Sequence, residues 1–283
     1  MSEARPRISV VVPVFNNERY LREALQSVLD QTAGDFEIVV ADQRSTDGSR
    51  ALVESFDDPR IRLVVNETST GAVANWNLVT AEARGRYVKL LCADDVLYPD
   101  CLERQAAVLD DPANANVALV TARHDVIDEA GRPKLVRGFR KRGRLAGHEA
   151  IRAMARSGTN FVGEPSGVMF RAEAYRAAGP WEERARYVVD MEMWTRLLLQ
   201  GDVFVVGEVL SAFRTQRGSW SNSLEAETQT ADMRWLLERL ASDERYGVSR
   251  ADVRRGMRRA WVNSQLRRLF YRRFLRGGGV GGE

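Results

Sequence analysis

Two adjacent carboxylates, Asp94 and Asp95, come directly after an apolar run at residues 87–91. Neighbouring carboxylates at the end of a buried strand repel each other and lose hydration, and a divalent cation offsets both effects. Mg²⁺ and Mn²⁺ take carboxylate oxygens and keep positions for water or phosphate. The pair therefore indicates a metal site at the end of a strand, where open α/β sheets bind ligands. The alternative is a solvated turn before Pro99, in which Asp95 or Asp100 caps a helix.

The composition limits which chemistry the chain can carry. Its 283 residues are 44% hydrophobic and 29% charged, which is typical of a globular protein with one large domain or two fused lobes. With only His124 and His148, the sequence disfavours a His-rich zinc site, and carboxylates are the expected acid–base groups. Cys92 and Cys101 suit free thiols rather than a disulfide framework.

The positive charge is concentrated at the C-terminal end. Residues 253–283 hold nine arginines and one acid, so this segment carries +8 and the rest of the chain −5. Its arginines alternate with apolar residues such as Trp261 and Leu266. Two interpretations stay open: a basic amphipathic helix on an anionic membrane, or an apolar stripe docked on the body with solvated arginines. Nucleic-acid binding is a weaker interpretation, because no recognised module accompanies the charge.

The N-terminal residues do not resemble a signal peptide, and no apolar run reaches the roughly 20 residues that cross a bilayer. We therefore expect a cytoplasmic protein, either free or resting on the inner face of the membrane.

Alternating strands and helices must position these residues. Buried β-branched runs separated by amphipathic segments of 10–15 residues are typical of βαβ units with a parallel sheet. Asp47 is expected to cap the second helix. The predicted order is strand 8–14, a helix from about 18 to near 34, strand 36–41, helix 49–56, strand 61–65, helix 72–83 and strand 86–91.

A second region begins after residues 111–112 and mixes shorter elements. A basic loop with several glycines is expected at 137–147, and residues 277–283 are expected to be disordered. The predicted strands are 117–122, 125–134 with a turn, 167–171, 203–206 and 209–214, and the predicted helices are 148–156, 173–178, 190–200 and 224 to about 275.

Four motifs occur in an order and spacing that resemble a known family. They are Val-Val-Pro-Val-Phe-Asn at 11–16, Ala-Asp-Gln-Arg-Ser-Thr-Asp-Gly-Ser at 41–49, Cys-Ala-Asp-Asp at 92–95 and Val-Asp-Met-Glu-Met-Trp at 189–194. Over about residues 7–220 the chain resembles the family 2 glycosyltransferases of the GT-A fold.

The resemblance implies an α/β, Rossmann-like fold with a mostly parallel central sheet flanked by helices, followed by a C-terminal helical extension. It also implies a division of the chain into four parts. These are a nucleotide-sugar-binding half at 1–111, an acceptor-binding and catalytic half at 112–223, a basic helical extension at 224–276 and the disordered tail at 277–283.

By resemblance, several residues would bind the nucleotide-sugar donor, with a UDP- or dTDP-sugar favoured. Asp42 would accept a hydrogen bond from the uracil or thymine imide, and Asn77 would hold ribose or phosphate. Each also has an ordinary interpretation, such as strand-end packing for Pro13 and Phe15 or a lysine at a sheet edge for Lys89. The expected donor contacts are Pro13, Phe15, Asn16, Glu18, Asp42, Asn77, Lys89 and Asp94.

The resemblance also assigns the metal and the base. Asp94 and Asp95 would bind Mn²⁺ or Mg²⁺, with Asp95 as the favoured direct ligand because Cys92 stands where relatives often have an acid. Asp190 would deprotonate the acceptor, and Glu192 would act instead or orient it. As an alternative, Asp190 is only a helix N-cap, a role worth about 1 kcal/mol.

On the acceptor side, Glu164 and Trp194 are the expected contacts of a saccharide or lipid-linked acceptor. The expected function is an inverting, metal-dependent glycosyltransferase in bacterial polysaccharide or glycolipid assembly. Two other classes stay open: a sugar nucleotidyltransferase, although Pro13 to Asn16 replaces its Gly-rich phosphate loop, and a non-catalytic nucleotide-sugar or membrane-binding module.

Overall fold

In the computed structural model, residues 5–67, 71–139, 142–216 and 226–274 are described, except for the side chains of residues 226 and 267–274. The predicted disordered end at 277–283 and the predicted helix start at 224–225 lie outside the described residues.

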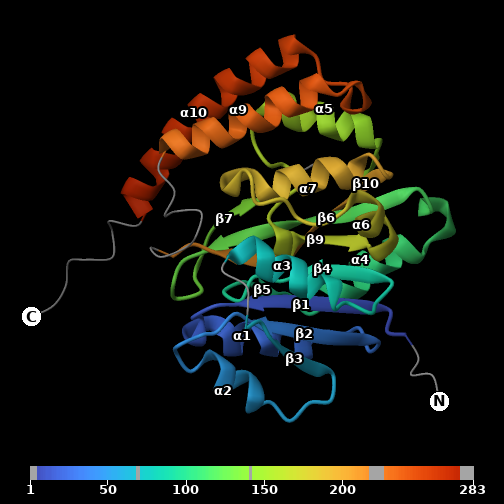
Figure 1. Ribbon diagram of the computed structural model, residues 1–283, viewed down its shortest axis with the longest axis vertical. Helices are drawn as coiled ribbons and strands as arrows, with labels where there is room; N and C mark the ends of the chain where they lie inside the picture. Colours follow the sequence, from blue (N-terminus) through green and yellow to red (C-terminus); the bar gives the residue numbers. More distant parts are fainter. Residues whose placement is uncertain (1–4, 68–70, 140–141, 217–225, 275–283) are drawn as a thin grey trace, which may run out of the picture.

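A single mixed sheet of ten strands runs through the described residues (Figure 1). Strands β3, β2, β1 and β4 are parallel neighbours in that order. The short β9 is antiparallel to β4 and to β6, and it thereby joins both parts of the chain in one sheet. Beyond it, β6 runs parallel to β10. The expected α/β sheet flanked by helices is confirmed. The strands are β1 Ile8–Val14, β2 Phe36–Asp42, β3 Ile61–Val65, β4 Tyr87–Leu90, β5 Val96–Leu97, β6 Val117–Ile127, β7 Pro133–Arg137, β8 Gly143–Leu145, β9 Val168–Arg171 and β10 Asp202–Arg214.

Helices cover both faces of this sheet because its strands are apolar on both sides. Successive side chains of a strand point to opposite faces, so Val11 packs into one core cluster, whereas Val10 and Val12 pack into the other. Helices α1 and α4 cover the second cluster, and α3, α5 and α7 cover the first. The helices are α1 Glu18–Leu29, α2 Ser49–Glu54, α3 Ala72–Ala81, α4 Cys101–Asp110, α5 Gly147–Ser157, α6 Ala172–Ala178, α7 Val189–Leu198, α9 Ala226–Ser242 and α10 Arg250–Phe274, with 3₁₀ turns η1 Pro112–Asn114, η2 Pro165–Gly167, η3 Arg186–Val188 and η4 Glu244–Tyr246.

Several details differ from the sequence prediction. The predicted strand 117–122 and the start of the predicted strand 125–134 form the single strand β6, β7 follows the turn, and the two-residue β5 was not predicted. The predicted strands 203–206 and 209–214 form the single strand β10, whose register with β6 shifts between Val206 and Val209. The predicted loop 137–147 contains β8, which pairs with β10. The predicted C-terminal helix is two helices, because the chain turns at Gly247, where φ is +62°, and a new helix starts at Arg250, directly after Ser249. There Ser249 and Asp252 bond to each other's backbone N–H in a capping box.

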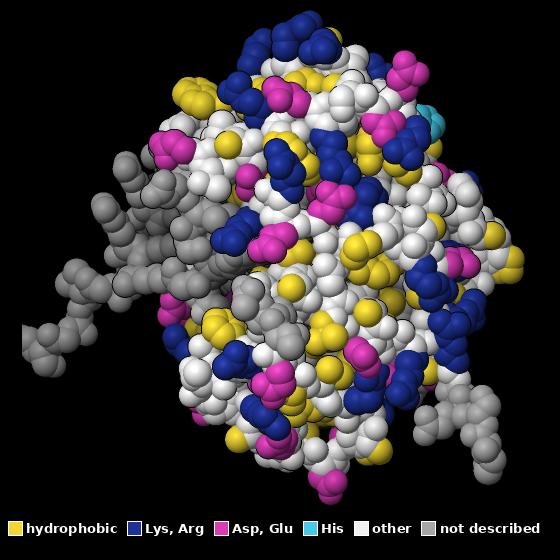
Figure 2. Space-filling view, viewed as in Figure 1, with side chains coloured by type: hydrophobic (Ala, Val, Ile, Leu, Met, Phe, Trp, Pro, Cys, Tyr) yellow, Lys and Arg dark blue, Asp and Glu magenta, His cyan; other side chains and the backbone are white. Residues whose placement is uncertain are grey.

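Helix α10 lies along α5 and α9 at one end of the molecule (Figure 1). Its Gly256 faces the carbonyl of Ala155, and an added Cβ there would lie 2.0 Å from that oxygen. Of the predicted apolar stripe, Met257 packs against the first core cluster and so docks on the body, whereas Trp261 and Leu266 are exposed. Arginine side chains gather over this end on the face shown in Figure 2. None of the described helices is both long and apolar enough to cross a membrane.

Candidate active site

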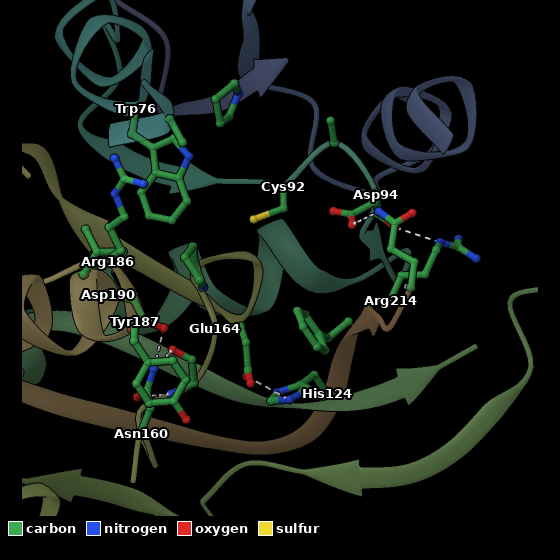
Figure 3. A pocket seen from close by; sticks show the side chains of 18 of the residues that line it. Trp76, Cys92, Asp94, His124, Asn160, Glu164, Arg186, Tyr187, Asp190 and Arg214 are labelled. Carbon is green, nitrogen blue, oxygen red and sulfur yellow. Dashed lines mark hydrogen bonds and ion pairs between the residues drawn. The ribbon is translucent and has the colours of Figure 1, made fainter. Parts of the chain in front are cut away.

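A cleft of about 1720 Å³ opens where β1 and β4 end, and most of the expected site residues line it (Figure 3). The segment after β1 forms one wall and the Cys92–Asp94 turn after β4 forms the floor. The opposite wall comes from the 159–165 loop and the start of α7. In Figure 3, Asp94 lies on one side of the pocket and Asp190 on the other.

The wall at the end of β1 holds four of the expected donor contacts: Pro13, Phe15, Asn16 and Glu18. Phe15 is 60% exposed, so its ring is available to a ligand instead of packing in the core. Asn16 has φ of +48°, and its Oδ1 accepts a hydrogen bond from Thr46 N–H at 2.7 Å. This fixes the turn next to Phe15.

Asp47 ties two helix starts together beside this wall. As predicted, its Oδ1 accepts a hydrogen bond from Ser49 N–H at 3.0 Å at the start of α2. Its Oδ2 also accepts one from Glu18 N–H at 3.0 Å, at the start of α1, a contact that the sequence did not indicate.

Asp42 lies at the end of β2 and is buried, with 1% of its surface exposed. Its Oδ2 accepts a hydrogen bond from Ser45 N–H at 3.3 Å, while its Oδ1 is buried and has no hydrogen-bond partner among the described residues. The neighbouring Gln43, rather than Asp42, lines the cleft. A buried oxygen without a donor is costly, so this atom has unused capacity to accept a hydrogen bond.

The two strand-end carboxylates have different environments. Asp94 is half-buried and lines the cleft, where its Oδ2 accepts a hydrogen bond from Gln216 at 2.7 Å. Asp95 is fully buried: its Oδ2 accepts from Ser166 Oγ at 2.6 Å and its Oδ1 from Arg214 N–H at 2.9 Å. Asp95 therefore anchors the turn and does not cap α4.

Burial raises the pKa of Asp94, and burial together with the charge of Asp94 raises the pKa of Asp95 well above its usual value. Both shifts express the cost of placing adjacent carboxylates in a poorly hydrated site.

Arg214, at the end of β10, supports this turn, a role that the sequence analysis did not predict. Its buried guanidinium donates to the Asp94 carbonyl at 2.8 Å and to Glu23 Oε2 at 2.7 Å, and it lies 4.6 Å from the centre of the Tyr20 ring. Contacts across 120 positions of sequence cannot be inferred from local spacing.

The carboxylates at this end of the cleft fit the binding of a Mg²⁺ or Mn²⁺ ion whose remaining ligands come from a substrate and water. Such ions are commonly held by one or two carboxylates plus phosphate oxygens and water. Asp94 offers one carboxylate at the cleft, whereas both Asp95 oxygens are engaged. Within the described ranges, no cluster of three or more His, Cys, Asp or Glu side chains is arranged as a complete protein cage.

Asp190 is half-buried in the first turn of α7 and lines the cleft. Its Oδ1 accepts a hydrogen bond from Met191 N–H at 2.7 Å, and its Oδ2 accepts one from Asn160 Nδ2 at 2.7 Å. Burial first, and then the charge of Glu164, raise the pKa of Asp190 to about 7 despite these hydrogen bonds. A carboxylate with a pKa near neutrality is suited to act as a general base.

Asn160 and Trp194 hold the loop that positions Asp190. Asn160 donates to the Gly163 carbonyl at 2.9 Å and accepts from Gly163 N–H at 3.0 Å. Trp194, fully buried on α7, donates from Nε1 to the same carbonyl at 2.9 Å. Trp194 does not line the cleft, so its expected contact with acceptor is corrected to support from behind the loop.

Glu164 lines the cleft beside this loop, backed by the buried His124. Its Oε2 lies 3.0 Å from His124 Nε2. Burial would raise the pKa of Glu164, but the charge and hydrogen bond of His124 and the charge of Arg137 outweigh it and hold that pKa at about 2. Glu164 therefore keeps a negative charge near Asp190.

Three other expected site residues do not reach the cleft. Glu192 is buried against Arg196, with Oε2 and Nη2 2.7 Å apart, because it lies on the inner side of α7. Lys89 is fully buried under the sheet and donates to Gln105 Oε1 at 2.9 Å. Asn77 exchanges hydrogen bonds with the backbone of Trp181 at 2.8 and 3.0 Å. All three have structural roles here.

The expected site residues did not include several residues that line the cleft. Asn75 donates to the Ala41 carbonyl at 2.9 Å and so ties α3 to the end of β2. Its neighbour Trp76 packs edge-on against Trp181, with ring centres 5.1 Å apart. Arg186 and Tyr187 come from η3, directly before Asp190. Their only sequence signal was their closeness to the motif at 189–194.

Comparison with known proteins gives consistent matches. Residues 9–178 match the family model described as Glycosyl transferase family 2. An uncharacterized protein of Mycobacterium tuberculosis is 33% identical over 220 residues, which are 76% of this chain and 69% of that protein. An uncharacterized glycosyltransferase of Rickettsia typhi is 23% identical over 241 residues, which are 84% of this chain and 74% of that protein.

Solved structures show the same fold. Residues 1–349 of TarS from S. aureus, in complex with UDP-GlcNAc, match with a TM-score of 0.68 at 19% identity, over 84% of this chain and 67% of that chain. The mannosyltransferase PcManGT from Pyrobaculum calidifontis, in complex with GDP-Man and Mn²⁺, matches with a TM-score of 0.61 at 18% identity, over 85% and 66%. The expected GT-A fold is confirmed by these matches.

Proposed function

Because this chain belongs to glycosyl transferase family 2, we propose that it is an inverting glycosyltransferase that moves a sugar from a nucleotide-diphosphate donor to an acceptor hydroxyl. The observation that carries the proposal is the position of Asp190. Its carboxylate lines the cleft, is held by two hydrogen bonds, and faces the same cavity as Asp94.

In the proposed reaction, an oxygen of Asp190 takes the proton of the acceptor hydroxyl. The acceptor oxygen forms a bond to the anomeric carbon as the bond from that carbon to the diphosphate breaks, and the nucleoside diphosphate leaves with the electron pair. One in-line displacement inverts the anomeric configuration. Asn160 contributes by fixing the carboxylate, since correct orientation of a base is itself part of catalysis.

We assign the direct metal contact to Asp94, in place of Asp95, because Asp94 lines the cleft and both Asp95 oxygens are engaged. A Mn²⁺ or Mg²⁺ ion, when bound there with the donor, supplies positive charge that neutralises the departing diphosphate. Asp95, Ser166 and the Arg214 backbone would keep the turn that carries Asp94 in place.

For the donor, we propose a UDP- or dTDP-sugar. Pro13 and Phe15 would contact the base, with Asn16 and Glu18 completing that wall. The unpaired Oδ1 of Asp42 would accept the imide N–H of uracil or thymine once Gln43 moves aside or the base reaches past it. TarS was solved with UDP-GlcNAc and PcManGT with GDP-Man, so the neighbours of the same fold support a nucleotide-sugar donor without selecting its base.

For the acceptor, we propose a saccharide or a lipid-linked saccharide, in bacterial polysaccharide or glycolipid assembly at the cytoplasmic side of a membrane. Glu164 would accept hydrogen bonds from sugar hydroxyls, because it is ionised and lines the cleft beside Asp190. The arginine-rich α10 is consistent with an anionic surface nearby.

A panel of nucleotide sugars tests the proposal. Purified protein would be incubated with each donor and Mn²⁺ or Mg²⁺, and both thermal shift and donor hydrolysis would be recorded. We expect one donor to raise the melting temperature and to be hydrolysed slowly, in a metal-dependent way. An Asp94→Asn variant should lose the metal-dependent part. If no donor gives a metal-dependent response, the enzyme proposal fails.

A further inference from the structure

A second groove, of about 560 Å³, runs between α9 and α10 and is mainly apolar. Met233 on α9 and Met257, Ala260, Trp261 and Val262 on α10 form its apolar lining. Trp261 and Val262 are 64% and 47% exposed. Large apolar side chains left exposed next to a groove are typical of a surface that binds an apolar ligand.

The groove leads into the cleft already described. Tyr187 and Met233 line both cavities, and Asn263 and Leu266, further along α10, line the cleft itself. Tyr187 belongs to η3, three residues before Asp190. A ligand extended along α10 would therefore have one end in the groove and the other beside Asp190, the proposed base.

The walls of the groove carry positive charge. Arg234 on α9 and Arg258 on α10 line it and are exposed, and neither forms an ion pair with the described part of the chain. None of the described residues that line the groove is acidic. Arginine without a carboxylate partner is well suited to phosphate, which its planar guanidinium binds through two parallel hydrogen bonds.

We propose that this groove binds the lipid phosphate end of the acceptor, so that the acceptor is a sugar carried on a lipid phosphate or diphosphate. The hydrocarbon chain would lie against Trp261, Val262 and Met257, the phosphate would contact Arg234 and Arg258, and the sugar would reach Asp190 past Tyr187. This inference rests on the proposed transferase function and narrows its acceptor to one chemical class.

Binding of dodecyl phosphate below its micellar concentration tests the inference, with the full chain and titration calorimetry as the measurement. Inorganic phosphate supplies the head alone and dodecyl maltoside an uncharged tail. We expect dodecyl phosphate to bind much more tightly than either. An Arg234→Gln/Arg258→Gln double variant should weaken it about tenfold or more, since a hydrogen bond between charged groups is worth at least that.

The matched control is Arg255→Gln/Arg259→Gln, which removes two exposed arginines of α10 that do not line the groove. We expect this control to bind dodecyl phosphate as the unmodified protein does. Equal loss in both double variants, or equal binding of dodecyl phosphate and dodecyl maltoside, would overturn the inference. So would binding to phosphatidylglycerol vesicles without binding of dodecyl phosphate, since that outcome assigns the arginines to a membrane surface.

Donor binding separates this inference from the proposed function. UDP with Mn²⁺ would be titrated into the same variants. We expect unchanged affinity, because none of the four substituted arginines lines the cleft in which the donor is proposed to bind. Normal donor binding and hydrolysis without dodecyl phosphate binding would reject the groove and leave the transferase intact.

Discussion

At the scale of single residues, Asp190 and Glu164 show how two neighbouring carboxylates take opposite protonation behaviour. His124 and Arg137 outweigh the burial of Glu164 and hold its pKa at about 2, whereas burial and the charge of Glu164 raise the pKa of Asp190 to about 7. Only the ionised form of Asp190 can accept the proton of the acceptor.

The pH dependence of turnover follows from this raised pKa. Below about pH 7, Asp190 becomes protonated, so kcat/KM should fall about tenfold for each further pH unit of acidification. Initial rates between pH 5 and 9, in buffers of constant ionic strength, measure this. A profile that stays flat down to pH 5 would contradict the assignment of Asp190 as the base.

Two substitutions should move the acidic limb of the pH profile, the range below about pH 7 in which kcat/KM falls, in opposite directions. The hydrogen bond from Asn160 lowers the pKa of Asp190, so Asn160→Ala should shift the limb to higher pH. The charge of Glu164 raises the same pKa, so Glu164→Gln should shift it to lower pH. Full pH profiles of both variants provide the measurement. Shifts in the same direction would mean that general damage to the loop, rather than electrostatics, changes the rate.

At the scale of elements, the sequence predicted the parallel strands of the first half because they are continuous β-branched runs. It located Asp94 and Asp190 because motifs at strand and helix ends are local in sequence. It could not predict that Asp95 bonds Ser166, because the two lie 71 positions apart. Likewise, which way Lys89 points depends on the face of β4 that α4 covers, and that face is set by packing.

Helix α7 gives a testable contrast between two acids of its first turn. Asp190 faces the cleft, but Glu192 forms a buried pair with Arg196. Removing one partner of such a pair leaves an uncompensated buried charge, so Glu192→Ala should lower the free energy of unfolding by about 3–5 kcal/mol. Urea denaturation measures this, and turnover per folded molecule should stay close to that of the unmodified protein. Normal stability with lost turnover would restore Glu192 as a catalytic residue.

At the scale of the whole molecule, α10 completes the far end of the cleft, because Asn263 and Leu266 line it. The sequence left open whether this segment docks on the body or meets a membrane. In the described residues the segment docks on the body, because Gly256 packs closely on α5. Trp261 and the arginines at 258 and 259 remain exposed, and their contact with a membrane stays a prediction.

Close packing of α10 on α5 can be tested with one methyl group. In Gly256→Ala the new Cβ would lie 2.0 Å from the Ala155 carbonyl oxygen, so the helices must separate. Such overpacking typically costs about 1–3 kcal/mol. We expect a lower melting temperature and faster proteolysis of α10. The control is Gly34→Ala, where an added Cβ has no atom within 4 Å. Equal behaviour of both variants would show that α10 is not held in this way.

The most direct test of the central claim compares the unmodified protein with Asp190→Asn, using whichever donor the panel identifies. Asparagine keeps the size of Asp190 and can accept one of its two hydrogen bonds, but it cannot take a proton, so donor affinity should remain while turnover falls by about 10²–10⁴-fold. Unchanged turnover in Asp190→Asn, with donor still bound, would contradict the claim that this carboxylate activates the acceptor.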